Sequence, residues 1–175
     1  MLFLLIGCAV AALLAGCGSK MTREKATPVT VTAVDRAGFD AAISRHRGKV
    51  VLVDFWATWC GPCVEQLPHT LELGHNLADR GLAVVTVSCD EPSETARVAE
   101  FLRSKEAGVA TNLISQFGAS QETMEAFEIA NGAVPYYQLY DRSGKLRETF
   151  GIDPRAVKPF TSADIEAAVE KLLAE

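Results

Sequence analysis

Two cysteines separated by two residues, Cys60 and Cys63, are the side chains of this sequence best suited to do chemistry. They follow a strongly apolar run and stand at the predicted start of a helix. Cysteines one helical turn apart can close a disulfide with little backbone movement, so the pair can cycle between dithiol and disulfide. The helix N-terminus stabilises a thiolate on Cys60, which is the reactive form of a cysteine. We therefore expect Cys60, which can remain exposed, to be the nucleophile and Cys63 to be the resolving residue.

A carboxylate stands in the middle of the apolar run that precedes the cysteines. Residues 50–56 read Val-Val-Leu-Val-Asp-Phe-Trp, as expected for a central strand that is buried on both faces. Asp54 is the charged residue among them, and a buried carboxylate is costly unless it has a partner or a function. Two interpretations follow: Asp54 takes part in the chemistry, or a neighbouring hydroxyl group satisfies it.

The run from Val53 to Cys63, Val-Asp-Phe-Trp-Ala-Thr-Trp-Cys-Gly-Pro-Cys, resembles thioredoxin. The longer arrangement, in which Val-Glu-Gln-Leu-Pro follows Cys63 and an apolar segment begins the chain, is similar to the TlpA-like membrane-anchored branch of the thioredoxin superfamily. The resemblance covers about residues 30–174. It implies an α/β, thioredoxin-like fold, with a central mixed β-sheet flanked by helices, and the activity of a thiol–disulfide oxidoreductase, a thioredoxin-like protein disulfide reductase.

The resemblance also implies roles for residues outside the cysteine motif. Asp54 matches the buried acid that shuttles a proton to and from the resolving cysteine, Cys63. Thr86 stands where thioredoxins often have a lysine near this acid. Val134 and Pro135 match a cis X-Pro bond that faces the cysteines, which presents the backbone of Val134 to a substrate strand.

The residues next to the nucleophile are expected to contact partner peptides. Trp59 precedes Cys60 and is expected at an apolar rim, and Gly61 and Pro62 complete the predicted substrate-binding set. Gly-Pro is the dipeptide of reducing thioredoxins, and this dipeptide tunes the reduction potential of the pair. We therefore expect a reductant of exported disulfide-containing proteins, apocytochrome c among them, which a membrane electron donor re-reduces.

The first 16 residues are almost wholly apolar and too short for a comfortable bilayer span. They predict a signal peptide, although the basic residue that usually precedes the apolar region is absent. Leu-Ala-Gly-Cys at positions 14–17 resembles a bacterial lipobox, which implies that Cys17 is lipidated. We expect a flexible tether over residues 17–28 and a thioredoxin-like domain over 29–175, held on the periplasmic side of a membrane. The alternative is an uncleaved anchor with an ordinary Cys17.

The rest of the sequence predicts one domain whose elements position the cysteines. Strands are expected at residues 29–34, 50–56, 82–88, 110–114, 136–140 and 145–150. Helices are expected at residues 39–48, 61–80, 94–105, 120–130 and 162–172, the last capped by Ser162. The alternation of strand and helix indicates parallel pairing in the first part, and the final two strands indicate a β-hairpin.

Composition argues against several classes of partner. The chain has 17 basic and 22 acidic residues without long runs of one sign, so nucleic acid is not an expected partner. No cofactor is expected, and no metal, because a site made of Cys60, Cys63 and His69 would lack a fourth ligand. Cys89 is expected to be a buried free thiol.

Two other functions stay open at this point. A peroxiredoxin-like thiol peroxidase would need the arrangement Pro-x-x-x-Thr-x-x-Cys, whereas Thr58 lies two residues before Cys60. A non-catalytic binding module or metallochaperone on the thioredoxin fold is the second alternative. Copper-delivery relatives usually separate their cysteines by three residues, and the spacing here is two.

Overall fold

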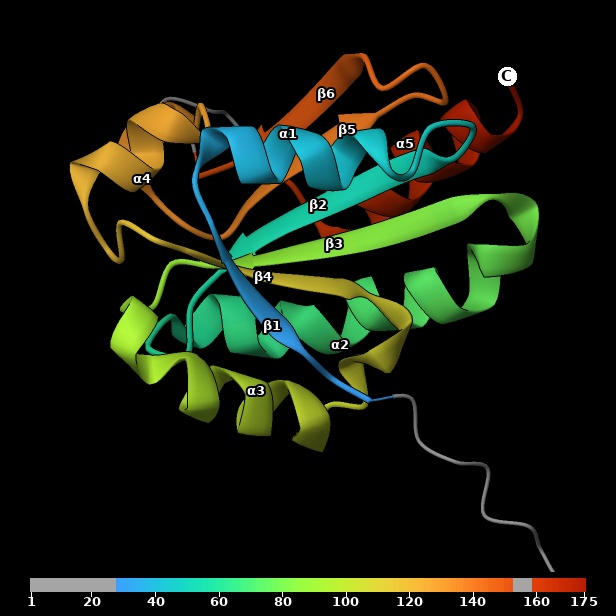
Figure 1. Ribbon diagram of the computed structural model, residues 1–175. Coiled ribbons are helices and arrows are strands. Elements are labelled where there is room, and N and C mark those ends of the chain that lie inside the picture. The colour runs from blue at the N-terminus through green and yellow to red at the C-terminus, as the bar shows by residue number, and fades with distance from the viewer. Residues whose placement is uncertain (1–27, 153–158) are drawn as a thin grey trace, which may run out of the picture.

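Strand β2 (Val50–Trp56), the apolar run that contains Asp54, lies inside a sheet and is buried along its whole length. A computed structural model describes residues 28–152 and 159–175 and places six strands in the order β1-β4-β3-β2-β5-β6 (Figure 1). The other strands are β1 (Val31–Val34), β3 (Leu82–Ser88), β4 (Thr111–Ser115), β5 (Tyr136–Tyr140) and β6 (Leu146–Gly151).

The sheet is mixed, as the resemblance implied. Strands β1, β4, β3 and β2 run parallel, and β5 and β6 are antiparallel to their neighbours. Parallel neighbours need a crossover connection, and helices supply it here. In the resulting register Asp54 pairs with Thr86 of β3 on one side and with Tyr137 of β5 on the other.

Helices cover both faces of the sheet. They are α1 (Arg36–Ser44), α2 (Gly61–Leu77), α3 (Thr95–Ser104), α4 (Gln121–Ala126) and α5 (Ser162–Leu173). In Figure 1, α1 lies above the sheet and α2 and α3 lie below it. Phe39, Phe55 and Phe127 pack their rings together on the α1 face, and α5 joins α2 over the other face through Val169 and Leu73.

Side-chain caps fix where the helices begin. Asp35 caps α1 by accepting a hydrogen bond from the backbone N–H of Gly38 at 2.8 Å. The cap of α5 is Thr161, which forms a capping box with Asp164. The prediction that Ser162 caps this helix is therefore wrong by one residue, because Ser162 is the first residue of the helix itself.

Several boundaries also differ from the prediction. The helix expected at residues 120–130 ends at Ala126, and a 3-10 turn follows at Ala130–Gly132. The first strand begins at Val31. The predicted signal peptide and Cys17 lie outside the described residues, as does the tether except for its last residue. Within residues 28–152 and 159–175, no helix is long and apolar enough to cross a bilayer.

Candidate active site

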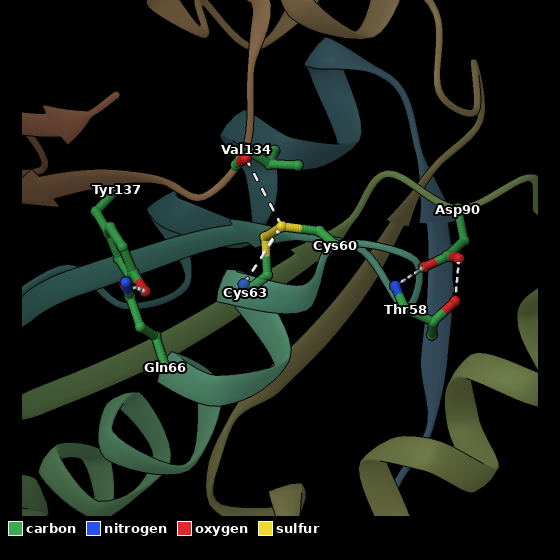
Figure 2. Close-up of a disulfide and its surroundings, with 7 residues drawn as sticks. All are labelled: Thr58, Cys60, Cys63, Gln66, Asp90, Val134 and Tyr137. Carbon is green, nitrogen blue, oxygen red and sulfur yellow. Dashed lines mark hydrogen bonds between the residues drawn. A yellow bond between two sulfur atoms is a disulfide. The ribbon is translucent and has the colours of Figure 1, made fainter. Parts of the chain in front are cut away.

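The two cysteines of the motif form a disulfide at the N-terminus of α2, with their sulfur atoms 2.03 Å apart. Cys60 is the N-cap of this helix, and the backbone N–H of Cys63 donates to Cys60 Sγ at 3.3 Å (Figure 2). Pro62 stands in the first turn, where its fixed φ suits the helix and its missing N–H has no partner to lose. The free N–H groups and the helix dipole stabilise negative charge on Cys60 Sγ after reduction.

Solvent reaches the cysteines less than expected. Only 7% of Cys60 and 1% of Cys63 is exposed, whereas 56% of Trp59 is exposed. The expectation that Cys60 remains exposed is therefore wrong for the disulfide form. The segment before β5 covers Cys60, since the carbonyl oxygen of Val134 lies 3.7 Å from Cys60 Sγ.

The bond between Val134 and Pro135 is cis, which confirms the implication of the resemblance. Figure 2 shows the Val134 carbonyl directed at the disulfide. A disulfide sulfur carries no proton, so this approach is a contact in the oxidised form, and only the reduced thiol of Cys60 could donate to the carbonyl. Exposed Trp59, Gly61 and Pro62 leave the other side of the disulfide open to a partner chain.

Asp54 lies beneath the active site in the centre of the sheet, with 1% of the residue exposed. Its Oδ2 accepts a hydrogen bond from the hydroxyl of Thr70 on α2 at 2.8 Å, so the neighbouring hydroxyl of the second interpretation is present. Thr86, at the position of the thioredoxin lysine, instead donates to Asn112 at 2.9 Å. No cation therefore comes from that position.

Burial raises the pKa of Asp54 from 3.8 to about 7, against the opposing effect of the nearby hydroxyl groups of Thr70 and Tyr137. Removal from water disfavours the charged carboxylate more than these two hydroxyl groups favour it. A carboxyl group that titrates near neutral pH can both take up and release a proton under ordinary conditions. Having a hydroxyl partner and serving in proton transfer are thus compatible for Asp54.

Tyr137 and Gln66 complete this side of the site, and sequence reasoning missed both. The hydroxyl of Tyr137 donates to Gln66 Oε1 at 3.1 Å, which links β5 to the active-site helix (Figure 2). Tyr137 is only 1% exposed, and burial raises the pKa of its hydroxyl. Its aromatic side chain reads as ordinary core in the sequence, so no local pattern marks it.

Asp90 holds the loop on the opposite side of the disulfide, and it too was missed. This fully buried carboxylate accepts hydrogen bonds from the backbone N–H and the hydroxyl of Thr58, two residues before Cys60. Ser88 donates to it at 2.7 Å and Arg97 lies 3.3 Å away. Its position in the sequence could have identified it. Asp90 follows the end of β3, and the cysteine motif follows the end of the adjacent parallel strand β2, so both lie at the same edge of the sheet.

The remaining candidate residues, Cys89 and His69, are not part of this arrangement. Cys89 is a free, buried thiol, and burial together with the charges of Asp90 and Asp54 raises its pKa to about 12, which keeps it protonated and unreactive. His69 is partly buried on α2. Among the described residues, no group of His, Cys, Asp and Glu is arranged to hold a metal ion.

Comparison with known proteins agrees with this geometry. The sequence model of the AhpC/TSA family matches residues 22–158. A relative named thiol-disulfide oxidoreductase ResA, from Geobacillus kaustophilus, is 25% identical over 138 residues, which cover 79% of this chain and 71% of the relative.

Solved structures show the same fold. A protein described as a thiol:disulfide interchange protein DsbE, from Chlorobium tepidum, is 26% identical with a TM-score of 0.53, over 75% of this chain and 83% of that one. The thioredoxin domain of a thiol-disulfide oxidoreductase from Bacteroides vulgatus is 24% identical with a TM-score of 0.56, over 74% and 83% of the two chains. The second likeness concerns the fold alone.

Proposed function

Because the chain belongs to the AhpC/TSA family of thioredoxin-like proteins and is a thiol–disulfide oxidoreductase, we propose that it reduces disulfides of exported proteins. The pair Cys60 and Cys63 carries the reaction. The observation that supports this most directly is the Cys60–Cys63 disulfide at the N-terminus of α2, with buried Asp54 behind it.

The reaction proceeds by two exchanges. The Cys60 thiolate attacks one sulfur of the client disulfide, a mixed disulfide forms, and the other client sulfur leaves as a thiolate that takes a proton from solvent. The Cys63 thiol then gives its proton to Asp54, and the resulting thiolate attacks Cys60 Sγ. The Cys60–Cys63 bond forms, and the second client sulfur leaves as a thiolate that takes a proton from solvent, to which Asp54 returns the proton it received. The client has gained two electrons, which a membrane electron donor returns to the pair.

Client binding uses the open side of the disulfide. Trp59 gives an exposed apolar surface, Gly61 and Pro62 are exposed beside it, and the backbone of Val134 borders the sulfur. A partner chain in extended conformation could pair with backbone groups at Val134 while its apolar side chains pack on Trp59. Apocytochrome c with an unwanted disulfide is one such client.

A trapping experiment tests the reaction and identifies clients. In Cys63→Ala the second exchange cannot occur, so mixed disulfides between Cys60 and exported proteins should accumulate in cells. The matched control is Cys60→Ala, which should trap nothing, and Cys89→Ala should behave like the unsubstituted chain. If Cys63→Ala captures no exported protein, the protein is better described as a binding module or metallochaperone.

The reducing direction rests on Gly61 and Pro62 and needs a separate test. A redox titration against glutathione and dithiothreitol should give a potential near the roughly −270 mV of thioredoxin. A value near the roughly −120 mV of a disulfide-forming oxidase would overturn the reducing direction. A peroxide-consumption assay should stay at background, and turnover of peroxide would favour the peroxidase alternative instead.

Attachment to the periplasmic side of a membrane is the third part of the proposal, and the lipobox-like sequence that ends at Cys17 supports it. Cells fed a labelled fatty acid should incorporate the label into the full chain and not into Cys17→Ser. Label in the Cys17→Ser variant, or none in either chain, would contradict lipidation at this residue.

A further inference from the structure

Tyr137 stands directly opposite Asp54 on the neighbouring strand. The two residues form a pair in the antiparallel register of β2 and β5, so their side chains leave the sheet on the same face. Helix α2 covers that face, and both residues are 1% exposed. The acid and the phenol are therefore enclosed together under the active-site helix.

Two side chains of α2 form hydrogen bonds with this pair. Thr70 donates to Asp54 Oδ2 at 2.8 Å, and Gln66 Oε1 accepts the proton of the Tyr137 hydroxyl at 3.1 Å. No hydrogen bond of ordinary length joins Tyr137 to Asp54 in this arrangement of the described residues. Asp54 Oδ1 is buried without a hydrogen-bond partner, next to the strand that carries Tyr137, and the Tyr137 hydroxyl lowers the pKa of this acid.

The Tyr137 hydroxyl has one proton and can donate it to one acceptor at a time. When Asp54 is protonated, it has a proton of its own to give, and the Tyr137 oxygen can accept it while the phenol donates to Gln66. When Asp54 is ionised, it competes with Gln66 for the phenol proton, and a carboxylate is the stronger acceptor.

We propose that Tyr137 is a positioning residue whose hydroxyl switches between Gln66 and Asp54 as Asp54 loses its proton. The proposal rests on the proposed function, in which Asp54 exchanges a proton with Cys63. Gln66 lies three residues after Cys63, one turn along α2, so the switch connects the charge of the buried acid to the helix that carries the resolving cysteine.

Few other ionisable groups face Asp54. Thr70 donates to it from α2, neutral Thr86 and Tyr137 pair with it from β3 and β5, and Cys89 follows β3. Helix α5 packs onto this face through the apolar residues Ile165, Ala168, Val169 and Leu172. His69 follows Gln66 by one turn of α2, so its substitution serves as a control.

The test is the pH dependence of the resolving step, measured as release of the second chromophore when the reduced protein reacts with a chromogenic aromatic disulfide. Tyr137→Phe keeps the ring and removes the donor to ionised Asp54. The midpoint of the profile should rise by about one pH unit, because a hydrogen bond to a charged group is worth about that much. The rate at pH 7 should fall about fivefold, and the alkaline plateau should stay unchanged.

Gln66→Leu should move the midpoint in the opposite direction, because it removes the competing acceptor and leaves the Tyr137 proton to Asp54. Tyr140→Phe is the matched control: this buried hydroxyl lies three residues along β5 and donates to Gln138 at 2.7 Å. Its midpoint should equal that of the unsubstituted chain. The same holds for His69→Gln.

The outcomes separate the switch from the proposed function. If Asp54→Asn abolishes the titration but neither Tyr137→Phe nor Gln66→Leu moves the midpoint, the switch is wrong and the role of Asp54 stands. If Asp54→Asn leaves the profile intact, the role of Asp54 in the proposed function is wrong. Loss of the titration in His69→Gln would also overturn the switch. If Tyr137→Phe fails to fold, which circular dichroism would show, a downward shift of the midpoint in Gln66→Leu supports the switch, and no shift or an upward shift overturns it.

Discussion

Asp54 is a carboxyl group in an environment that its type disfavours. It sits on the central strand with 1% of its surface exposed, and burial raises its pKa from 3.8 to about 7. A group bound more tightly to its proton in the folded state than in the unfolded state makes stability depend on pH. The same property that suits Asp54 to proton transfer should therefore be measurable in unfolding experiments.

The sign of this dependence follows from the direction of the pKa shift. Between pH 4 and 7 the unfolded chain loses the Asp54 proton while the folded chain keeps it, so stability falls as pH rises through this window and levels off above it. A rise from 3.8 to about 7 corresponds to about 4 kcal/mol. Asp54→Asn, which cannot ionise, should exceed the unsubstituted protein in stability at pH 8 by up to this amount.

Urea unfolding of the oxidised proteins at several pH values measures the effect. The difference between Asp54→Asn and the unsubstituted chain should shrink toward pH 4. Glu65→Gln is the matched control, because it makes the same kind of change at an exposed carboxylate of α2. A constant difference at all pH values would contradict a raised pKa for Asp54.

At the scale of elements, the loop before α2 is held by a residue of a different strand. Asp90 at the end of β3 accepts two hydrogen bonds from Thr58 and one from Ser88. Asp90→Ala leaves the part-buried N–H of Thr58 without its acceptor and should lower the free energy of unfolding by about 3 kcal/mol. Denaturant unfolding checks the loss of stability.

The same substitution should slow the reaction of reduced Cys60 with a small alkylating agent, because Thr58 fixes the chain two residues before the nucleophile. Glu94→Ala is the matched control, since Glu94 is the other acidic partner of Arg97, at 2.8 Å, and has no link to Thr58. It should change stability by less than about 1 kcal/mol. Equal losses in the two variants would mean that Asp90 acts only through Arg97.

Helix α5 offers a second prediction at this scale. Thr161 accepts a hydrogen bond from the backbone of Asp164, and Asp164 accepts one from the backbone of Thr161 at 2.7 Å. Thr161→Ala should therefore cost about 1 kcal/mol in unfolding free energy. Ser162→Ala, one residue on, should be close to neutral. A larger loss of unfolding free energy in Ser162→Ala than in Thr161→Ala would indicate that Ser162 is the cap.

At the scale of the whole molecule, the disulfide is a small part of a core that extends over the sheet. Its two cysteines are three residues apart at one helix end. The buried core residues come from strands β1 to β5, and β6 adds the partly buried Leu146 and Phe150. Closing so short a loop restricts the unfolded chain only slightly. Redox cycling should therefore leave the fold intact.

Reduction should lower the free energy of unfolding by about 2 kcal/mol at 25 °C. Chemical denaturation with and without dithiothreitol measures this change, and circular dichroism should show the same folded spectrum in both states. The double variant Cys60→Ala/Cys63→Ala should not respond to dithiothreitol. Unfolding on reduction would mean that the disulfide is structural and would argue against a cycling pair.

The sequence by itself determined the chemistry and much of the fold. The motif at Cys60 and Cys63, the acid in an apolar strand and the apolar helical stripe of α5 are local patterns, and local patterns follow from side-chain preferences along one segment. They were sufficient to predict the strands, the helices and a redox pair at a helix start, and the resemblance to thioredoxin supplied the mixed sheet flanked by helices.

Only the tertiary structure decided which residues surround that pair. Tyr137 meets Asp54, and Asp90 meets Thr58, through strand pairings between segments 83 and 32 residues apart. The covering of Cys60 by Val134 has the same origin. Contacts across a sheet depend on register, which no single segment contains. The sequence thus determined what reacts, and the fold decided how exposed the nucleophile is and which hydroxyl groups accompany its acid.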